Sequence, residues 1–273
     1  MVAVRPTGGD GGRRGAYAFG DTAVASRRLD VLASVFGPTS TALLADLPPG
    51  ERRVVLDLGC GPGHTTAMLA TAFPEAQVTG IDSSEAFVAE AAAGAPPRCS
   101  YRVADVTRLP LPGAPADVVY ARFLVVHLPD PHAVMAQWAS QLVPGGVLVV
   151  EEPEQIDTDD GDFRRYLDLA AVVVGSRGGD LYAGRLLADA TPPPSTAVLL
   201  RRRTALDVPA GRASTIFSLN LATWGDDPAL AGVVSPDEVA ELGARLERRV
   251  GDPSTGVIGW WMGQLVVGRG VDP

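Results

Sequence analysis

A strand, a glycine-rich turn and the start of a helix follow one another in Val54-Val55-Leu56-Asp57-Leu58-Gly59-Cys60-Gly61-Pro62-Gly63-His64. An apolar strand that leads through glycines into a helix brings backbone N–H groups close to a bound ligand. The dinucleotide fingerprint G-x-G-x-x-G would require a glycine at position 64, which is His64. A phosphate-binding P-loop would require a lysine, and the sequence contains none. The remaining pattern, D-x-G-x-G-x-G, indicates a ligand site of another kind.

Acidic residues also end the next two apolar runs of the sequence. Residues 76–81 are followed by Asp82 and Ser83, and residues 100–104 are followed by Asp105. An acid at the end of the second strand of a nucleotide-binding α/β fold can accept both hydroxyls of a ribose, so Asp82 is a candidate ribose ligand. Each aspartate could instead cap a strand end or stabilise a turn.

The order and spacing of these strand ends resemble the class I S-adenosylmethionine-dependent methyltransferases from about residue 50 to residue 152. The resemblance implies S-adenosylmethionine as the cofactor, with Asp105 on its adenine amine and Val106 against the ring. This cofactor offers a sulfonium and several hydrogen-bond donors to carboxylates, and it lacks the pyrophosphate that Asp57 would repel. The residues that the resemblance implies for cofactor binding are Tyr17, Asp57, Gly59, Gly61, Gly63, Asp82, Ser83, Asp105, Val106 and Arg122.

Catalysis is less clearly marked in the sequence than cofactor binding. Methyl transfer is an in-line displacement at carbon, and positioning of the acceptor against the methyl group can supply most of the acceleration. His127 is the candidate general base, because it follows the fourth apolar run, at 117–123, whose end faces the cofactor in this topology. His127 could instead cap the next helix or pack behind the site.

Arg122 could bind the carboxylate of the cofactor or of a substrate with two parallel hydrogen bonds. The choice between Arg122 and His127 depends on the acceptor. A carboxylate acceptor would suit Arg122 and would need no base, whereas a phenol or an amine would suit His127.

Aromatic residues suggest two further features of the site. Tyr17 and Phe19 precede the first predicted helix, and we expect this segment to act as a lid in which an aromatic ring covers the sulfonium. These rings could instead only hold the helix against the sheet. Trp224, Trp260 and Trp261 could line an aromatic substrate pocket, although core packing is expected for at least two of them.

Composition favours a small-molecule enzyme of the cytoplasm. The net charge, 23 − 32 = −9 at pH 7, argues against a nucleic-acid partner, because phosphate-backbone binding requires a basic surface. No apolar run approaches the roughly 20 residues of a membrane-spanning helix, and no signal peptide is expected. The two cysteines define no disulfide framework, and no Cys/His spacing suggests a metal. The oligomeric state is left open, with a homodimer as one option.

Strands and helices alternate from residue 52 to residue 152, which predicts a parallel sheet with helices on both faces. By resemblance, the fold is α/β: a doubly wound, Rossmann-like sheet of seven strands, the last one antiparallel between the fifth and the sixth, plus a helical cap. We expect a flexible tail at 1–14 and then a single domain. Its expected parts are an N-terminal helical lid at 15–50, broken near Gly37 and Pro38, a cofactor-binding core at 51–152, a cap at 153–196, and C-terminal strands and a helix at 197–273.

The sequence therefore predicts methyl transfer from S-adenosylmethionine to an oxygen or nitrogen of a small metabolite, with overall features like those of bacterial natural-product pathways. Two alternatives remain open. The chain could keep the cofactor fold for a non-methylating role, as a rearrangement catalyst or a sensor. It could also act on a macromolecule such as a peptide.

Overall fold

The computed structural model describes residues 21–252 and 256–270, so the expected tail at 1–14 and the predicted lid residues Tyr17 and Phe19 lie outside the described residues. Its main elements, in chain order, are α1 (Ala23–Ala45), β1 (Val54–Leu58), α2 (His64–Ala72), β2 (Gln77–Asp82), α3 (Glu85–Ala93), β3 (Cys99–Val103), β4 (Ala116–Arg122), η1 (Val125–His127), α4 (Pro131–Ser140), β5 (Leu142–Asp157), α5 (Gly161–Ser176), α6 (Gly184–Ala188), β6 (Thr196–Pro209), α7 (Ala210–Trp224), η2 (Pro228–Leu230), α8 (Pro236–Glu247) and β7 (Val257–Arg269).

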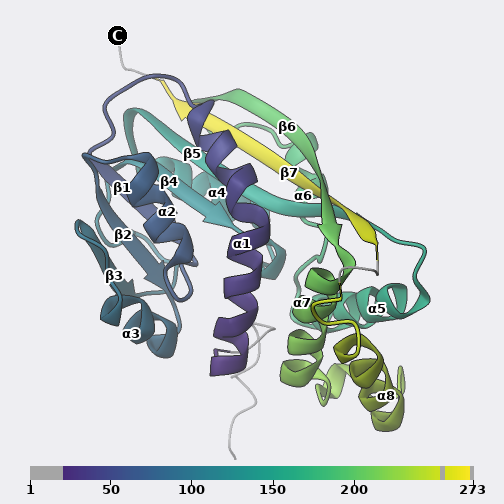
Figure 1. Cartoon of the computed structure of the whole chain (residues 1–273). Helices are drawn as coiled ribbons and strands as arrows, with labels where there is room; N and C mark the ends of the chain where they lie inside the picture. The colour runs from purple at the N-terminus through teal and green to yellow at the C-terminus, as the bar shows by residue number, and fades with distance from the viewer. Residues whose placement is uncertain (1–20, 253–255, 271–273) are drawn as a thin grey trace, which may run out of the picture.

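These strands form one sheet of seven in the order β3-β2-β1-β4-β5-β7-β6 (Figure 1). The strands β1 to β5 pair in parallel, and β7 is inserted antiparallel between β5 and β6. The predicted doubly wound sheet with its antiparallel last strand is confirmed. In the register, Leu58 lies opposite both Ile81 and Ala121, so β1, β2 and β4 end level with one another at one edge of the sheet.

Helices cover both faces of the sheet, as the near-continuous apolar strands require. On one face, α1 and α2 pack over a core that includes Leu43, Leu69 and Val118. On the other face, α4 and α6 pack over a second core that includes Trp138 and Leu187. The central strands β1 and β4 are therefore buried on both sides, and the strand ends are the place where a ligand can reach the sheet.

The predicted break in the first helix is wrong, because α1 continues through Gly37 and Pro38. Proline cannot donate to the carbonyl of Ser34, one turn earlier, and its ring usually clashes with the side chain of the preceding residue. Gly37 has no side chain to clash. Phe36 and Leu43, both fully buried, anchor the helix on either side of the proline.

A helical cluster of α5, α7, α8 and the first half of α1 lies at one end of the long strands β5, β6 and β7 (Figure 1). Strand β5 continues to Asp157 because the segment beyond residue 152 still pairs with β7. The cluster draws α5 from the segment expected to form the cap, and it draws α7 and α8 from the C-terminal segment. Its core includes Phe163, Phe217 and Leu242, which are all fully buried.

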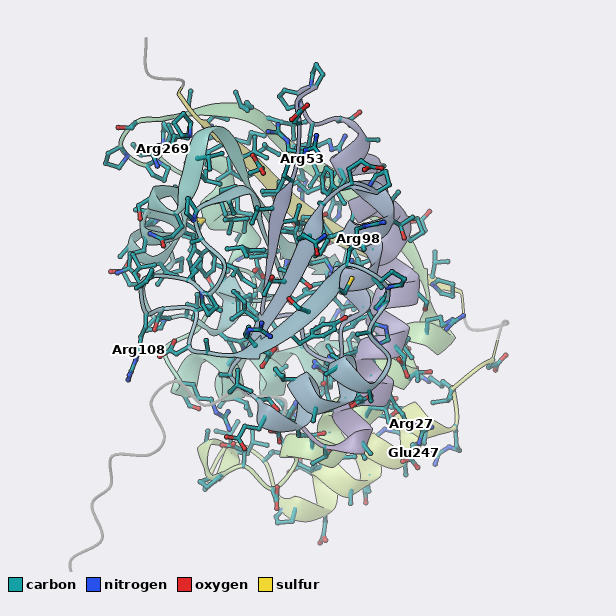
Figure 2. The ribbon with its side chains drawn as sticks, turned by 90° about the vertical axis from the view of Figure 1, so that its left-hand side faces the viewer. Arg27, Arg53, Arg98, Arg108, Glu247 and Arg269 are labelled. Atoms are coloured by element: carbon teal, nitrogen blue, oxygen red, sulfur yellow. The ribbon has the colours of Figure 1, made fainter. Side chains whose placement is uncertain are left out.

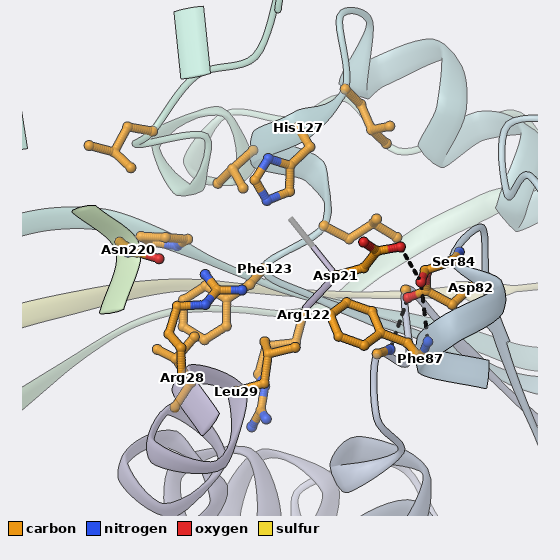
Figure 3. Close-up of a pocket in the computed structure, with 18 of the residues that line it drawn as sticks. Asp21, Arg28, Leu29, Asp82, Ser84, Phe87, Arg122, Phe123, His127 and Asn220 are labelled. Atoms are coloured by element: carbon orange, nitrogen blue, oxygen red, sulfur yellow. Dashed lines mark hydrogen bonds between the residues drawn. The ribbon is translucent and has the colours of Figure 1, made fainter. Parts of the chain in front are cut away.

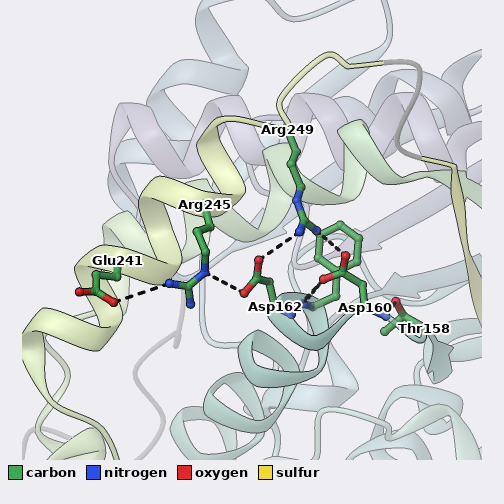
Figure 4. A network of polar contacts seen from close by, with 7 residues as sticks. Thr158, Asp160, Asp162, Glu241, Arg245 and Arg249 are labelled. Atoms are coloured by element: carbon green, nitrogen blue, oxygen red, sulfur yellow. Dashed lines mark hydrogen bonds and ion pairs between the residues drawn. The ribbon is translucent and has the colours of Figure 1, made fainter.

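An ion-pair network fixes α8 on the start of α5 (Figure 4). Arg245 Nε lies 2.8 Å from Asp162 Oδ1, and Arg249 contacts Asp160 at 2.5 Å and Asp162 at 3.1 Å. Asp160 also caps α5 by accepting from the backbone of the first turn, which is favourable at a helix N-terminus. The network ties together the elements that cover the strand ends.

Close backbone packing of α6 on β7 gives a stability prediction. A Cβ at Gly263 of β7 would lie 2.5 Å from the carbonyl oxygen of Gly184 in α6, so Gly263→Ala must push the two elements apart. We expect a loss of about 1–3 kcal/mol in the free energy of unfolding, measured by urea denaturation. Gly243→Ala, in the interior of α8 with no atom within 4 Å of the added methyl, is the matched control and should stabilise by about 0.5–1 kcal/mol. Equal effects of the two substitutions would contradict this packing.

Candidate active site

A cavity of about 1150 Å³ lies between the strand ends and the helical cluster (Figure 3). The cavity receives residues from the turns after β1, β2, β3 and β4, and from α1, α5 and α7. The predicted site residues that line it are Gly59, Gly61, Asp82, Ser83, Asp105, Val106, Arg122 and His127. The structure thus brings together residues that are spread over most of the predicted core.

The glycine turn uses its own backbone N–H groups within the fold. The N–H groups of Gly59 and Cys60 donate to the carbonyl of Ile81 at 2.8 and 3.1 Å, and that of Gly61 donates to Asp82 Oδ2 at 2.9 Å. Gly59 and Gly61 have φ angles of 64° and 52°, which explains the requirement for glycine. The expectation that this turn presents its N–H groups to a ligand is therefore wrong for these three groups, because they are already bonded to the end of β2.

Asp57 and Gly63 do not line the cavity, and their contact with the cofactor stays a prediction. Asp57 is fully buried, and its Oδ2 accepts from the hydroxyls of Thr65 and Thr66 at 2.6 Å each. Burial raises the pKa of Asp57 to about 6. A Cβ at Gly63 would lie 2.7 Å from the hydroxyl oxygen of Tyr101. Both residues hold the glycine turn and α2 in place from behind.

One end of the cavity is acidic (Figure 3, right). Asp82 accepts from the backbone N–H groups of Gly61 and Ser84, and burial raises its pKa. The hydroxyl of Ser84 donates to Asp21, which also lines the cavity. Asp105 accepts from Thr107, and this hydrogen bond holds its pKa below the usual value. Carboxylate oxygens at this end can accept further hydrogen bonds from hydroxyl and amine donors.

The opposite end is basic. Arg28 and Arg177 line the cavity there and act on His127, and Figure 3 shows Arg28 on the side away from Asp82. Arg122 also lines the cavity, but its charge acts on Asp57, behind the glycine turn. Arg122 donates to the hydroxyl of Ser40 on α1 at 2.9 Å. Burial, followed by the charges of Arg28 and Arg177, lowers the pKa of His127 to about 3. His127 is therefore neutral at physiological pH but is a weak proton acceptor.

The segment that carries His127 is held by a buried glutamate. Glu152 Oε1 accepts from the backbone N–H groups of Leu124 and Val125 at 2.8 and 2.6 Å, at the start of η1. Phe123, just before, has a φ of 55°, in the left-handed region that a bulky residue rarely adopts. Glu151 and Glu152, within β5, are both fully buried.

Several lining residues were not identified from the sequence. They come from α1, α3, α5 and α7, and include Arg28, Leu29, Phe87, Tyr166, Phe217 and Asn220. Helical residues of this kind follow the ordinary core pattern and carry no local motif, so no signal in the sequence distinguishes them. Of the three tryptophans considered, Trp260 lines the cavity, Trp224 is buried in the helical cluster, and Trp261 lies outside it and donates to Asp157.

Known proteins resemble the segment that carries most of these strand ends. The profile of a family described as a methyltransferase domain matches residues 55–146. A trans-aconitate 2-methyltransferase of Methylobacterium radiotolerans is 35% identical over 144 residues, which are 53% of this chain and 55% of that protein. The same enzyme of Escherichia coli K12 is 41% identical over 112 residues, 41% of this chain and 44% of that protein. The chain thus spans about half the length of the curated relatives it matches.

Solved structures share the fold over most of the chain. Coclaurine N-methyltransferase bound to N-methylheliamine and S-adenosylhomocysteine aligns with a TM-score of 0.53 at 14% identity, over 88% of this chain and 72% of that one. The cyclase SpnF aligns with a TM-score of 0.52 at 20% identity, over 89% and 93%. The chain therefore has the Rossmann-like fold of these structures. Within it, residues 55–146 match a methyltransferase domain.

The buried Glu152 gives a pH prediction. Its pKa is raised by burial from 4.5 to about 8, so the folded protein retains a proton that the unfolded chain releases above about pH 4.5. The stability of the wild type should therefore fall relative to Glu152→Gln as the pH rises from about 5 to 8. The glutamine keeps an oxygen for the N–H groups of Leu124 and Val125 and does not titrate. Denaturation of both proteins at several pH values measures the difference, and a difference that does not change with pH would contradict the raised pKa.

Proposed function

We propose that the protein transfers a methyl group from S-adenosylmethionine to an oxygen or nitrogen of a small molecule, and that a carboxylate oxygen is the acceptor this site favours. The observation that supports the proposal is the division of one cavity into an acidic end and a basic end. A cationic methyl donor suits the first, and an anionic acceptor suits the second.

The residues at the acidic end have hydrogen-bonding groups that suit the cofactor. The glycine turn has three of its N–H groups bonded within the fold, which leaves no such cradle for a pyrophosphate. Asp82 and Ser83 would hold the ribose hydroxyls, and Asp105 would accept from the adenine amine. Val106, nearly fully buried, would pack on the ring. S-adenosylmethionine would supply a methyl group on a positively charged sulfur, which leaves with the electron pair of the broken carbon–sulfur bond.

The cavity has room for both reactants. Sites for a single small molecule usually measure about 300–1,000 Å³, and this cavity measures about 1150 Å³. The guanidinium groups of Arg28 and Arg122 would orient an anionic acceptor toward the strand ends. A carboxylate oxygen has no proton to lose at neutral pH, so the transfer would need orientation and exclusion of water but no base.

His127 would then act as a positioning group. With its pKa lowered to about 3, it stays neutral and can donate one hydrogen bond and accept another across the physiological range. For an acceptor that must lose a proton, such as a phenol or an amine, His127 would be a poor base. The structure therefore favours the carboxylate over the other two acceptors that the sequence left open.

The curated relatives support an acid as acceptor, because they are named for trans-aconitate. They give no support to the natural-product setting that the sequence suggested. As for partners, we propose a small molecule and no nucleic acid. Arg27, Arg53, Arg98, Arg108 and Arg269 project at separate places on the surface (Figure 2). Within residues 21–252 and 256–270, no helix has the length and apolarity to cross a membrane.

Cofactor binding gives a direct prediction. Asp82→Asn removes a charge-assisted acceptor, and we expect the Kd of S-adenosylmethionine in isothermal titration calorimetry to rise about 10- to 100-fold. Asp159→Asn is the matched control, since Asp159 is fully exposed and pairs with Arg164 on the surface, and it should bind as the wild type does. NAD should not bind. Tight binding of NAD, or equal affinities of the two variants, would overturn the cofactor assignment.

A second prediction concerns His127. If positioning dominates, His127→Ala should lower kcat by less than about 100-fold, below the usual upper contribution of a general base. The pH dependence of kcat between pH 6 and 8 should be the same in both proteins, because the imidazole is already neutral throughout that range. Labelled methyl transfer to trans-aconitate measures both quantities. If kcat falls by more than about 100-fold, and the pH profile of kcat also loses an inflection near neutral pH, His127 is a base.

A further inference from the structure

The part of the cavity beside Asn220 has an aromatic wall. Tyr166 and Phe217 stack with their centroids 4.0 Å apart and 16° between their planes, and Trp260 continues the wall 6.2 Å from Phe217. All three line the cavity. Phe36 packs behind this wall against Phe123 and Trp260 at 5.0 and 5.1 Å, so the rings are held from behind.

Two buried polar groups on this wall lack hydrogen-bond partners among the described residues. Asn220 is 4% exposed, and its amide nitrogen donates to the hydroxyl of Tyr166 while its Oδ1 has no partner. If the amide is turned over, the unpartnered atom is the nitrogen instead. Trp260 is 5% exposed, and its Nε1 has no partner. Buried polar groups without partners are rare, and a bound molecule is one way to satisfy them.

The location of the unpartnered atoms of Asn220 and Trp260 on the cavity wall indicates a ligand site. Trp224 Nε1 is also unpartnered among the described residues, but it does not line the cavity. Asn220 and Trp260 both do, and Figure 3 shows Asn220 on the same side as Arg28 and opposite Asp82. The basic end, the aromatic wall and the unpartnered amide thus belong to one region of the cavity.

We propose that this region binds an acceptor of a defined class: a carboxylic acid with an apolar ring body and one further hydrogen-bonding group, such as a hydroxyl. The carboxylate faces the basic end, the ring packs on Phe217 and Trp260, and the further group bonds Asn220. The inference rests on the proposed function and makes it more specific. It separates this protein from its curated relatives, since trans-aconitate has no ring to cover the wall.

The proposed class of acceptor predicts an order of binding affinities among related acids. Matched probes are 4-hydroxycinnamate, cinnamate, which lacks the hydroxyl, and trans-aconitate. Calorimetry in the presence of S-adenosylhomocysteine measures the binding of each acid whether or not it is methylated. We expect 4-hydroxycinnamate to bind at least tenfold more tightly than trans-aconitate, and more tightly than cinnamate, because the hydroxyl satisfies a buried group.

Variants then test which residues bind the hydroxyl of 4-hydroxycinnamate. Asn220→Ala should reduce the advantage of 4-hydroxycinnamate over cinnamate at least fivefold while leaving the affinity for cinnamate within a factor of two. Trp260→Phe keeps a ring and removes only the Nε1 donor, so it should retain the preference for ring acids over trans-aconitate. Ser218→Ala is the control on α7, since Ser218 donates to Thr215 and does not line the cavity. Unchanged binding of S-adenosylhomocysteine shows that each variant is folded.

Two outcomes would overturn the inference: trans-aconitate binding as tightly as the ring acids, or Asn220→Ala weakening cinnamate and 4-hydroxycinnamate equally. Failure of the proposed function is a separate result. It would appear as no transfer of labelled methyl to any of the three acids, although the order of their affinities would still decide the inference.

Discussion

The hydrogen bonds between the glycine turn and the end of β2 decide what this site can bind. Ile81 and Asp82 take the N–H groups of Gly59, Cys60 and Gly61, so the turn is closed by the neighbouring strand. In a dinucleotide site, N–H groups at such a turn hold phosphate oxygens. Here the carbonyl of Ile81 accepts from two of these N–H groups, and the carboxylate of Asp82, which lines the cavity, accepts from the third. One set of contacts thus builds the turn and makes this end of the cavity suited to cations and hydroxyl donors.

Helix α1 connects both ends of the cavity to the rest of the fold. Its Ser26 donates to Glu90 on α3, and Asp30 pairs with His64 at the start of α2 at 2.8 Å. Arg28, between Ser26 and Asp30 on the same helix, lies at the basic end, and Ser40 accepts a hydrogen bond from Arg122. A movement of α1 would therefore change the acidic end and the basic end together. Under the proposed function, this coupling would let the helix align the two reactants.

The sequence predicted the sheet and its strand ends well, because buried parallel strands are apolar runs and the acids that follow them are local signals. It predicted less well what each side chain does. Asp57 has the spacing of a ligand residue, but its carboxylate turns toward Thr65 and Thr66. The lowered pKa of His127 comes first from its burial and then from the charges of Arg28 and Arg177, which lie far from it in the sequence. The substrate end is formed by helices packed through tertiary contacts, and no local pattern marks their cavity-facing residues.

A crystal structure with S-adenosylhomocysteine would show directly which groups hold the cofactor. We expect ribose hydroxyls within hydrogen-bond distance of Asp82, the adenine between Val106 and Asp105, and the N–H groups of Gly59 and Gly61 still bonded to Ile81 and Asp82. A ligand bound at the basic end alone, or a glycine turn that releases Asp82 and donates its N–H groups to the ligand, would contradict this expectation.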